Sequence, residues 1–484
     1  MRASKHLEGD LLGGHNYSDH NEESLKRGLS SRHIQLMSIG GAIGTGLFMG
    51  SGKTISLSGV SIILTYMIIG FFLFMVMRAM GELLLSNSNF KSFADFSAAY
   101  LGPWAGFFIG WSYWLTWAVG TIADFVVIGG YLRFWFPEMP LWIPTLGTLS
   151  LLLSLNIMSV KLFGEFEFWF ASIKIVAILS LIATGIWLIC TSYVSSDGVS
   201  ASLTNLYAQG TFMPHGIMGF FAGFQIAIFS FAGIELIGTT AAETKNPEKT
   251  LPKAINAVPL RVLIFYVAAI AVVISVSSLA DISPNQSPFV QLFLHAGLPA
   301  AAGIINIVVT TSAMSAANSG VFSTSRMLYG LSVEQDAPKF LGKLTASSVP
   351  VNAILFSCFC MLVGSGLLFI FPNVMEAFTL VTTICAILFI FTWSMIIFSY
   401  LVYRKKRPDL HDRSTYKMPY GITMCWCSLA FFAFVLTLLL LEKDTRDALF
   451  CMPIWFLGLW FSYKIRSREE RYTILKTGNR TDLK

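Results

Sequence analysis

Ionisable side chains occur inside strongly apolar stretches of this sequence. Lys174 stands in the middle of residues 170–176 (FASIKIV). A charged group placed in hydrocarbon costs roughly 2.5–3.5 kcal/mol on insertion scales. The alternative is that the amine reaches a membrane boundary, but the boundary that we predict near Glu167 is distant. We therefore predict a buried amine that faces the first and eighth apolar segments and binds and releases a proton.

Three carboxylates also fall in or beside apolar segments. Asp124 lies within 120–125 (GTIADF), where it could contact a ligand or pair with another helix. Glu235 follows a glycine-containing interruption, and both gating and structural hydrogen bonding are open to it. Glu82 is four residues after Arg78, the spacing of an ion pair on one face of a helix. We predict that Glu82 forms this pair and belongs to a gate.

Glycine-rich interruptions occur in two of the apolar segments. The first segment contains 40–46 (GGAIGTG), and the sixth contains 229–235 (FSFAGIE). Glycine favours unwinding because it loses the most backbone entropy when held helical. Close packing between helices is the alternative reason for small residues in a membrane. However, the two interruptions occupy matching places in two successive five-segment sets, an arrangement typical of a binding site at the membrane midplane.

Unwound helices expose backbone groups that lipid cannot hydrogen-bond, so these groups must face a cavity or a ligand. A half-helix that begins near Thr45 offers N–H groups and a positive dipole end to a carboxylate. Half-helices that end near Ile43 and Phe231 offer carbonyl groups to an ammonium. An amino acid carries both groups on one carbon. The predicted substrate-binding residues are Ala42, Ile43, Gly44, Thr45, Gly46, Asp124, Ser230, Phe231, Ala232 and Gly233.

The sequence lacks the residue patterns of an enzyme or a metal protein. The seven cysteines fall in or at the edge of apolar runs, with no histidine beside them at metal-ligand spacing. His33, His215, His295 and His411 lie at helix ends or in loops, and none is paired with an acid in mid-membrane. We therefore predict no enzyme activity, no catalytic residue, no metal and no cofactor beyond a proton gradient.

The elements that position these residues are membrane-spanning helices. Hydrophobic residues make up 55% of the 484 and charged residues only 12%, far from the balance of soluble proteins. About 20 apolar residues are needed to cross a bilayer as a helix. Runs of this kind predict twelve helices in an all-α integral membrane protein, starting near Ile34, Val60, Trp104, Leu141, Phe166, Ile217, Val262, Ala300, Ala353, Met375, Ile422 and Leu449.

The charges of the loops predict an orientation. With the N-terminus in the cytoplasm, Lys53, Arg133, Lys443 and Arg446 are the only ones of the 33 lysines and arginines on the outer side, and Lys174 lies within a helix. This asymmetry follows the positive-inside rule and places both termini in the cytoplasm. The basic run 404–407 is then an anchor beside acidic lipid rather than a nucleic-acid site. The first 32 residues are a polar tail and not a signal peptide.

Several motifs resemble those of the amino acid permeases in the amino acid–polyamine–organocation superfamily. They cover nearly the whole chain: 39–48, 48–57, 78–83, 163–170, 220–227, 229–235, 239–247, 251–255 and 322–328. The resemblance implies a five-plus-five inverted repeat with broken helices 1 and 6, and two further C-terminal helices. It also implies a proton-coupled importer in a bacterial cell membrane, with Lys174 at the place where sodium-coupled proteins of this fold bind an ion.

On this basis we divide the chain into a cytoplasmic tail (1–32), a transport core (33–403), helices 11 and 12 with their basic loop (404–464) and a second cytoplasmic tail (465–484). Within the family, the resemblance is strongest to members that carry D-alanine, D-serine and glycine. The alternatives are an exchanger for other neutral amino acids and an amino acid sensor that does not transport. The predicted partners are an amino acid and the lipid bilayer, with no nucleic acid and no obligate protein partner.

Overall fold

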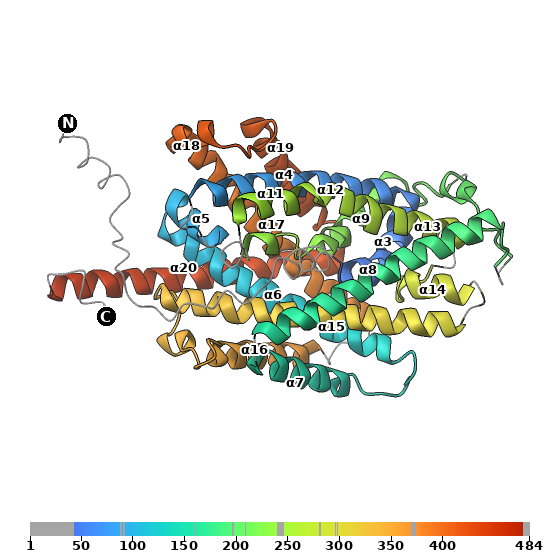
Figure 1. The fold of residues 1–484 in the computed structure, drawn as a ribbon, viewed down its shortest axis with the longest axis horizontal. Coiled ribbons are helices and arrows are strands. Elements are labelled where there is room, and N and C mark those ends of the chain that lie inside the picture. The colour runs from blue at the N-terminus through green and yellow to red at the C-terminus, as the bar shows by residue number, and fades with distance from the viewer. Residues whose placement is uncertain are drawn as a thin grey trace.

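A computed structural model describes residues 43–477, apart from 88–89, 91, 159, 196–197, 209, 240–245, 280–281, 296, 298 and 369–373. The predicted N-terminal tail, the start of the first helix and Ala42 lie outside the described residues. Within the described ranges the regular structure is helical, apart from an isolated β-bridge between Val194 and Ser200. Most of the long helices run roughly along one direction (Figure 1), as expected for a bundle that crosses a membrane.

The longer helices carry the membrane-spanning segments. In chain order they are α3 (Gly50–Ser58), α4 (Ile62–Ser86), α6 (Pro103–Leu132), α7 (Trp142–Met158), α8 (Val160–Cys190), α9 (Gly216–Ala227), α13 (Ala269–Val276), α15 (Pro299–Val333), α16 (Val351–Leu368), α17 (Val374–Lys406), α19 (Gly421–Leu438) and α20 (Lys443–Thr477).

Shorter elements extend these helices or connect them. They are α2 (Thr45–Phe48), η1 (Gly59–Ser61), α5 (Phe93–Leu101), η2 (Leu203–Leu206), η3 (Ile228–Phe231), α10 (Leu236–Thr239), α11 (Pro247–Asn256), α12 (Val258–Arg261), the π-helix η5 (Val262–Ala268), α14 (Pro288–His295), η6 (Lys339–Gly342) and α18 (Pro408–Arg413).

The helices match the predicted number of membrane spans. Eight helical stretches in the described ranges are long and apolar enough to cross a membrane, and three shorter apolar helices join them. One of the eight combines α3 and α4, which are separate spans because the chain turns at Gly59. Gly59 has φ +60°, and a Cβ there would lie 2.4 Å from the carbonyl oxygen of Thr211. Glycine is therefore required at this turn. With α3 and α4 counted as separate spans, the eight stretches and the three shorter helices give twelve spans.

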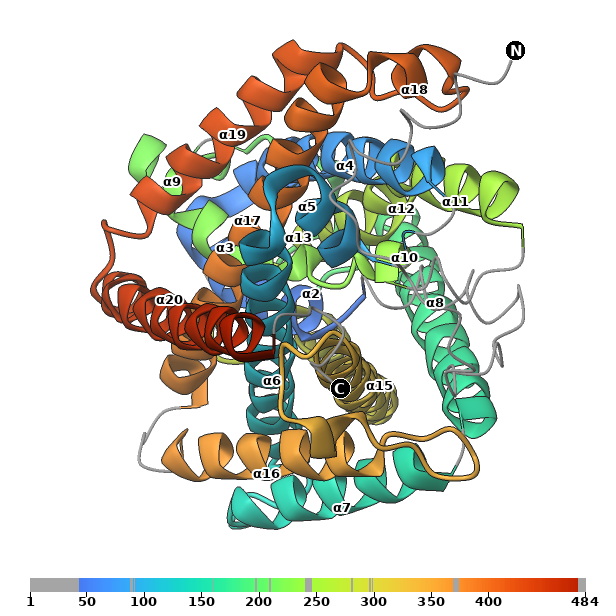
Figure 2. The same cartoon turned by 90° about the vertical axis from the view of Figure 1, so that its left-hand side faces the viewer.

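Helices that correspond by position in the two five-helix sets pack against each other. In the first set α3, α4, α6 and α7 contribute spans 1 to 4, and in the second α9, η5, α15 and α16 contribute spans 6 to 9. The structure packs α3 against α9, α4 against η5, α6 against α15 and α7 against α16. Figure 2 shows α6 and α15 near the centre, with α7 and α16 as a layer beside them. This pairing agrees with the expected inverted repeat.

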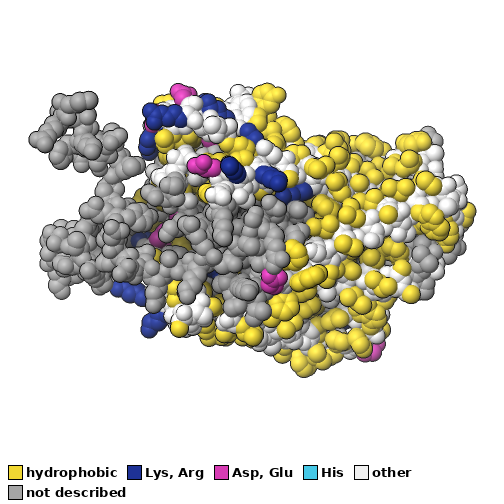
Figure 3. Space-filling model, in the orientation of Figure 1, with side chains coloured by type: hydrophobic (Ala, Val, Ile, Leu, Met, Phe, Trp, Pro, Cys, Tyr) yellow, Lys and Arg dark blue, Asp and Glu magenta, His cyan; other side chains and the backbone are white. Residues whose placement is uncertain are grey.

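The surface is that of a membrane protein. Large apolar side chains such as Trp169, Phe359 and Ile454 are more than half exposed, and hydrophobic atoms cover most of the described surface in Figure 3. Lys and Arg side chains gather at one end, over α18 and the end of α17. We call this the basic end; the sequence predicts that it faces the cytoplasm.

Two of the helices begin before the predicted starts of their apolar runs. Helix α8 begins at Val160, ahead of Phe166, and α20 begins at Lys443, ahead of Leu449, because polar residues at a helix end extend the helix beyond its apolar core. The apolar spans themselves cover Gly164–Cys190 and Thr445–Arg466, within about one helical turn of the predicted starts. Two divisions of the chain also fall inside helices. Helix α17 continues to Lys406, past the end set for the core at 403, and α20 continues to Thr477, into the predicted tail.

Candidate functional site

The helix of the first span begins where its glycines predict, and the residues before Ile43 lie outside the described part of the chain. Gly44 has an extended backbone (φ −129°, ψ −164°), and α2 begins at Thr45. As the first residues of a helix, Thr45 and Gly46 have N–H groups with no carbonyl in a preceding turn to bond. Before the break, the carbonyl of Ile43 accepts a hydrogen bond from Oγ of Ser312 at 3.3 Å. The predicted helix start at Thr45 is confirmed.

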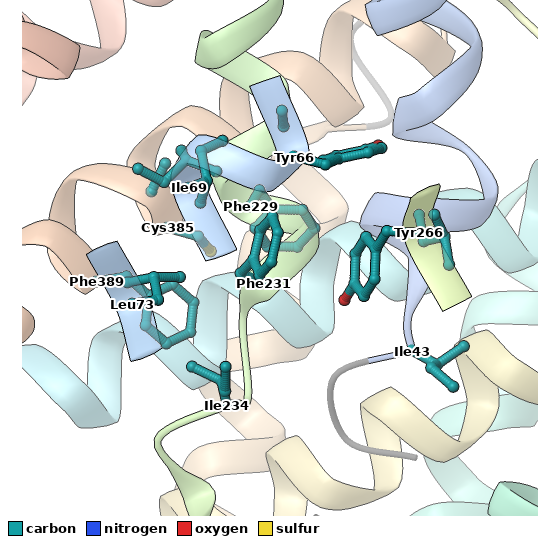
Figure 4. Close-up of a cluster of buried hydrophobic side chains, with 14 of the residues drawn as sticks. Ile43, Tyr66, Ile69, Leu73, Phe229, Phe231, Ile234, Tyr266, Cys385 and Phe389 are labelled. Carbon is teal, nitrogen blue, oxygen red and sulfur yellow. The ribbon is translucent and has the colours of Figure 1, made fainter. Parts of the chain in front are cut away.

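The sixth span is interrupted at the predicted glycine. The helical part ends with η3 at Phe231, Ala232 turns away (ψ +137°), and Gly233 adopts φ +91°, which favours glycine. The chain becomes helical again only at Leu236. Figure 4 shows the backbone leaving the helical path between Phe231 and Ile234. One carbonyl before the break is already engaged, since Tyr266 donates a hydrogen bond from its hydroxyl to the Ser230 oxygen at 2.7 Å.

The two interruptions lie directly against each other. A Cβ added to Gly46 would lie 2.6 Å from Cα of Ser230 and 2.9 Å from its nitrogen. Only a residue without a side chain allows this approach of α2 to η3. Two segments nearly two hundred residues apart in the chain therefore form one backbone surface, as the paired breaks predict.

A small cavity of about 40 Å³ opens beside the two breaks. It has polar walls from α2 and α8 and aromatic walls from α6, η3 and α17. The residues that line it are Gly44, Thr45, Gly46, Thr116, Trp117, Gly120, Asp124, Glu167, Lys174, Phe229, Ser230, Ala232, Ala316, Ser319 and Phe389. A water molecule needs about 10–15 Å³ measured in this way, so the cavity has room for about three.

Three ionisable side chains are gathered at the cavity. Lys174 and Glu167 are 1% exposed and Asp124 is 5% exposed. Oγ1 of Thr45 donates a hydrogen bond to Oδ1 of Asp124 at 2.8 Å, which connects α6 to the start of α2. The amine of Lys174 lies within electrostatic range of both carboxylates. As predicted, Lys174 is buried and faces spans 1 and 8, whose Gly44 and Ala316 line the same cavity.

Glu167 was missed as a site residue. Because α8 begins at Val160, Glu167 lies about two turns inside the helix. Oε1 accepts a hydrogen bond from Oγ of Ser315 at 2.8 Å. A signal for this position does exist in the sequence: Glu167 and Lys174 are seven residues apart, a spacing that places both on one face of a helix.

The aromatic walls also differ from the prediction. Phe231 does not line the cavity; its ring stacks on Tyr266, with centroids 4.8 Å apart and an angle of 8° between the planes. Gly233 likewise shapes the break without lining the cavity. Phe229, two residues before Phe231, takes the position at the cavity instead. Figure 4 shows the Phe229 and Phe231 rings projecting from this segment. The sequence gives no sign of which aromatic ring turns inward.

Glu235 lies after the sixth-span break and is fully buried. The hydroxyl of Tyr113 on α6 donates a hydrogen bond to its Oε1 at 3.2 Å. It lies outside the lining of the cavity. Glu235 therefore links the broken sixth span to α6, a contact that suits both of the predicted roles, gating and structural hydrogen bonding.

The predicted ion pair between Arg78 and Glu82 is wrong. Glu82 turns toward the end of α17 and the loop after it. Its Oε2 accepts hydrogen bonds from the hydroxyl of Tyr400 on α17 and from the backbone N–H of Met418 in the loop, both at 2.8 Å. Nδ1 of His411 lies 2.5 Å from Oε1. Arg78 instead donates to Oδ1 of Asn256 at 2.8 Å and to a carbonyl of the same loop. Both side chains thus fix loops at the basic end.

Known proteins resemble this chain over most of its length. A family model described as "Amino acid permease" matches residues 33–476. The chain is 59% identical over 438 residues to the D-serine/D-alanine/glycine transporter of Escherichia coli K12, covering 90% of this chain and 93% of that protein. It is 49% identical to the amino-acid permease AapA of Bacillus subtilis (92% and 96% covered). It is 38% identical to the aromatic amino acid transport protein AroP of Escherichia coli O6:H1 (92% and 97% covered).

Proposed function

Because the chain belongs to the amino acid permease family, a family of transporters and not of enzymes, we propose that it imports small neutral amino acids together with protons. It is a multi-pass membrane protein, and the resemblance predicted from its motifs is confirmed. The proposal extends this in three respects: the substrate class, the coupling ion and the direction of transport.

The contact between the two helix breaks is the observation that carries the proposal. The start of α2 at Thr45 presents N–H groups and a positive dipole end, which suit the carboxylate of an amino acid. The carboxylate of Asp124 and the carbonyls that precede the breaks suit its ammonium. A zwitterion thus satisfies groups of both signs without adding net charge to the membrane interior. Alternate opening of the cavity to either side would follow movements of these interrupted spans.

Two observations favour small substrates. The cavity is only about 40 Å³, and Trp117, Phe229 and Phe389 close it with bulky rings. The 59% identical relative is named for D-serine, D-alanine and glycine. We therefore propose D-alanine, D-serine and glycine as substrates. The handedness comes from the relative alone, because nothing in the lining residues selects it.

Lys174 supports coupling to protons. It is an amine held in the membrane interior beside the substrate cavity, within electrostatic range of two carboxylates. A charged side chain in the membrane interior is energetically costly, so such residues are rare there and usually belong to a proton or ion pathway. We propose that Lys174 takes up a proton with the substrate and gives it up on the far side. The basic end would face the cytoplasm, in line with the positive-inside rule.

Uptake into liposomes tests the proposal. The purified protein is reconstituted, and labelled D-alanine uptake is measured with and without an inward proton gradient. Glycine, D-serine, L-alanine and L-arginine serve as competitors. We expect uptake that rises with the gradient, collapses with a protonophore and is blocked by the small neutral amino acids only. Counterflow with no dependence on the gradient would support an exchanger instead. Binding without any transport would support a sensor, and no response to D-alanine would refute the substrate class.

The substitution Lys174→Gln separates coupling from transport. With the membrane potential clamped, one coupled proton supports about tenfold accumulation per pH unit of gradient. We expect the variant to reach an accumulation ratio of about one while counterflow of D-alanine persists. Lys343→Gln, at an exposed lysine of a loop, is the matched control and should accumulate as the parent does. Unimpaired accumulation by Lys174→Gln would contradict the role of Lys174.

A further inference from the structure

Glu167 is a buried acid that the proposed transport cycle does not yet use. It projects from α8 into the lining of the cavity and is 1% exposed. Oε1 accepts the hydrogen bond from Ser315, whereas Oε2 is buried and has no hydrogen-bond partner among the described residues. A buried carboxylate oxygen without a donor is costly, and such atoms in native proteins call for an explanation.

The position of Glu167 relative to Lys174 is suited to proton transfer. The two residues lie seven positions apart on one face of α8, a rise of about 10 Å, and both side chains line the same cavity. Electrostatic interaction between the two groups is present in this structure. Helix α8 runs away from the basic end, so Glu167 lies nearer to that end than Lys174 does (Figure 1). A proton moving inward from Lys174 would meet Glu167 next.

Polar groups continue beyond Glu167 between α7, α8 and α15. Nδ2 of Asn156 donates to Oδ1 of Asn318 at 2.9 Å, and Asn318 lies close to Glu167. Oδ1 of Asn156 and Nδ2 of Asn318 are themselves buried without a partner among the described residues. Buried amide groups with unused hydrogen-bonding capacity mark a polar route through an otherwise apolar interior.

We propose that Glu167 accepts the proton of Lys174 and passes it on toward the basic end. The step breaks one N–H bond of the Lys174 ammonium and forms an O–H bond on Glu167 Oε2, leaving a neutral amine and a neutral carboxylic acid. The pair has zero net charge before and after the transfer. The transfer itself therefore creates no net charge inside the membrane. Water at the basic end then accepts the proton from Glu167, and the one negative charge left on the pair is compensated when Lys174 takes up the next proton. This inference rests on the proposed proton symport.

Few other charged groups face this pair. Asp124 approaches Lys174 from α6. Helices α7 and α13, which pack on α8, carry no charged side chain. The charged residue of α15 is Arg326, eleven residues from Ser315 or about 16 Å along the helix, and its guanidinium lies over the Phe322 ring. The pH dependence of coupling should therefore follow Lys174, Glu167 and Asp124.

The substitution Glu167→Gln tests the inference in reconstituted protein. It keeps an oxygen to accept from Ser315 and removes the group that can take the proton. D-alanine influx and proton influx, the latter reported by a trapped pH-sensitive dye, are measured together under a gradient of about one pH unit. For the parent we expect about tenfold accumulation with proton entry. For Glu167→Gln we expect a ratio of about one, no substrate-linked proton entry, and D-alanine counterflow that persists.

Control variants show whether Glu167 has only a structural role. Glu165→Gln makes the same change two residues away, outside the cavity lining, and should accumulate like the parent. Ser315→Ala removes the hydrogen bond to Glu167 but leaves the carboxylate, and should retain proton entry. Glu167→Asp keeps an ionisable carboxyl and should retain coupling at a reduced rate, which preserves the test if the glutamine variant does not fold.

The possible outcomes separate this inference from the proposed function. Gradient-driven accumulation by Glu167→Gln equal to that of the parent would overturn the role of Glu167 and leave symport intact. Loss of counterflow together with accumulation, in a variant that remains monodisperse, would assign Glu167 to substrate binding and also overturn it. A parent protein that shows no proton entry would refute symport itself and, with it, this inference.

Discussion

Two buried glutamates of this protein have the same exposure but differ in how completely their oxygens are hydrogen-bonded. Glu82 and Glu167 are each 1% exposed. Glu82, at the basic end, is close to three polar groups, from Tyr400, His411 and Met418, and both of its oxygens are engaged. Glu167, at the cavity, also has polar side chains beside it, from Ser315, Asn318 and Ser319, but among the described residues only Ser315 donates within hydrogen-bond distance, and Oε2 is left without a donor.

The difference separates a structural carboxylate from one that is available for chemistry. A fully hydrogen-bonded buried group stabilises one arrangement, here the loop after α17 held against α4. A buried group with an unused hydrogen-bonding position destabilises the resting structure, and it gains a stabilising interaction when a proton or a ligand binds to it. The comparison predicts that changes around the cavity affect transport, whereas changes around Glu82 affect stability. The following predictions test that division, from the largest expected effect to the smallest.

The substitution Gly46→Ala should have the largest effect. The new Cβ would lie 2.6 Å from the Ser230 backbone, so α2 and η3 must move apart. Overpacking of this kind costs about 1–3 kcal/mol, and here it falls on the contact between the two breaks. We expect initial D-alanine uptake to fall by about tenfold or more. Gly147→Ala is the control, because a Cβ at that position meets no atom within 4 Å. Equal uptake by both variants would disprove the importance of this contact.

The substitution Asp124→Asn should have an intermediate effect on transport. Asparagine keeps an oxygen for the Thr45 hydroxyl but removes the charge that we assign to the substrate ammonium. Hydrogen bonds to charged groups contribute about 1.5–3 kcal/mol, so KM for D-alanine should rise about tenfold or more with little change in thermal stability. Asp447→Asn, at an exposed residue, is the control. A lowered Tm with an unchanged KM would instead show that Asp124 has a structural role.

The substitution Glu82→Gln should affect stability and leave transport nearly unchanged. The amide removes the charge near His411 and turns an N–H group toward the donors that Glu82 now accepts from. We expect a loss of about 2 kcal/mol and a Tm lower by a few degrees in detergent. KM for D-alanine should stay within about twofold of the parent. A large loss of uptake with an unchanged Tm would place Glu82 in the transport cycle and break the comparison.

The sequence predicted correctly those features that depend only on neighbouring residues in the chain. The spans at Ile62, Pro103 and Trp142 begin within two residues of their predicted starts, because hydropathy of a run of about 20 residues is enough to define a span. The breaks at Thr45 and Gly233 were predictable because glycine lowers the cost of unwinding wherever it occurs. The burial of Lys174 follows from its place in the middle of an apolar run.

The sequence did not predict side-chain contacts that depend on how a helix is rotated or where a loop packs. Nothing near Phe229 or Phe231 shows which ring faces the cavity, because α4 and η5 decide it by enclosing Phe231 between Tyr66 and Tyr266. Glu82 has the correct spacing for Arg78, yet its partners come from α17 and the loop after it, more than three hundred residues later. Nearby charges attract only weakly compared with a well-formed set of buried hydrogen bonds.

The sequence by itself therefore determined that this chain crosses a membrane about twelve times, where its glycine-rich breaks lie, and that the amine of Lys174 is buried. These follow from apolar run length and backbone entropy, which act over neighbouring residues. Only the tertiary structure decided that Glu167 joins Lys174 at the cavity, that Phe229 replaces Phe231 in its wall, and that Glu82 fixes a distant loop. The orientation of a side chain about its helix axis is set by the helices packed against it, and no local property of the chain encodes those neighbours.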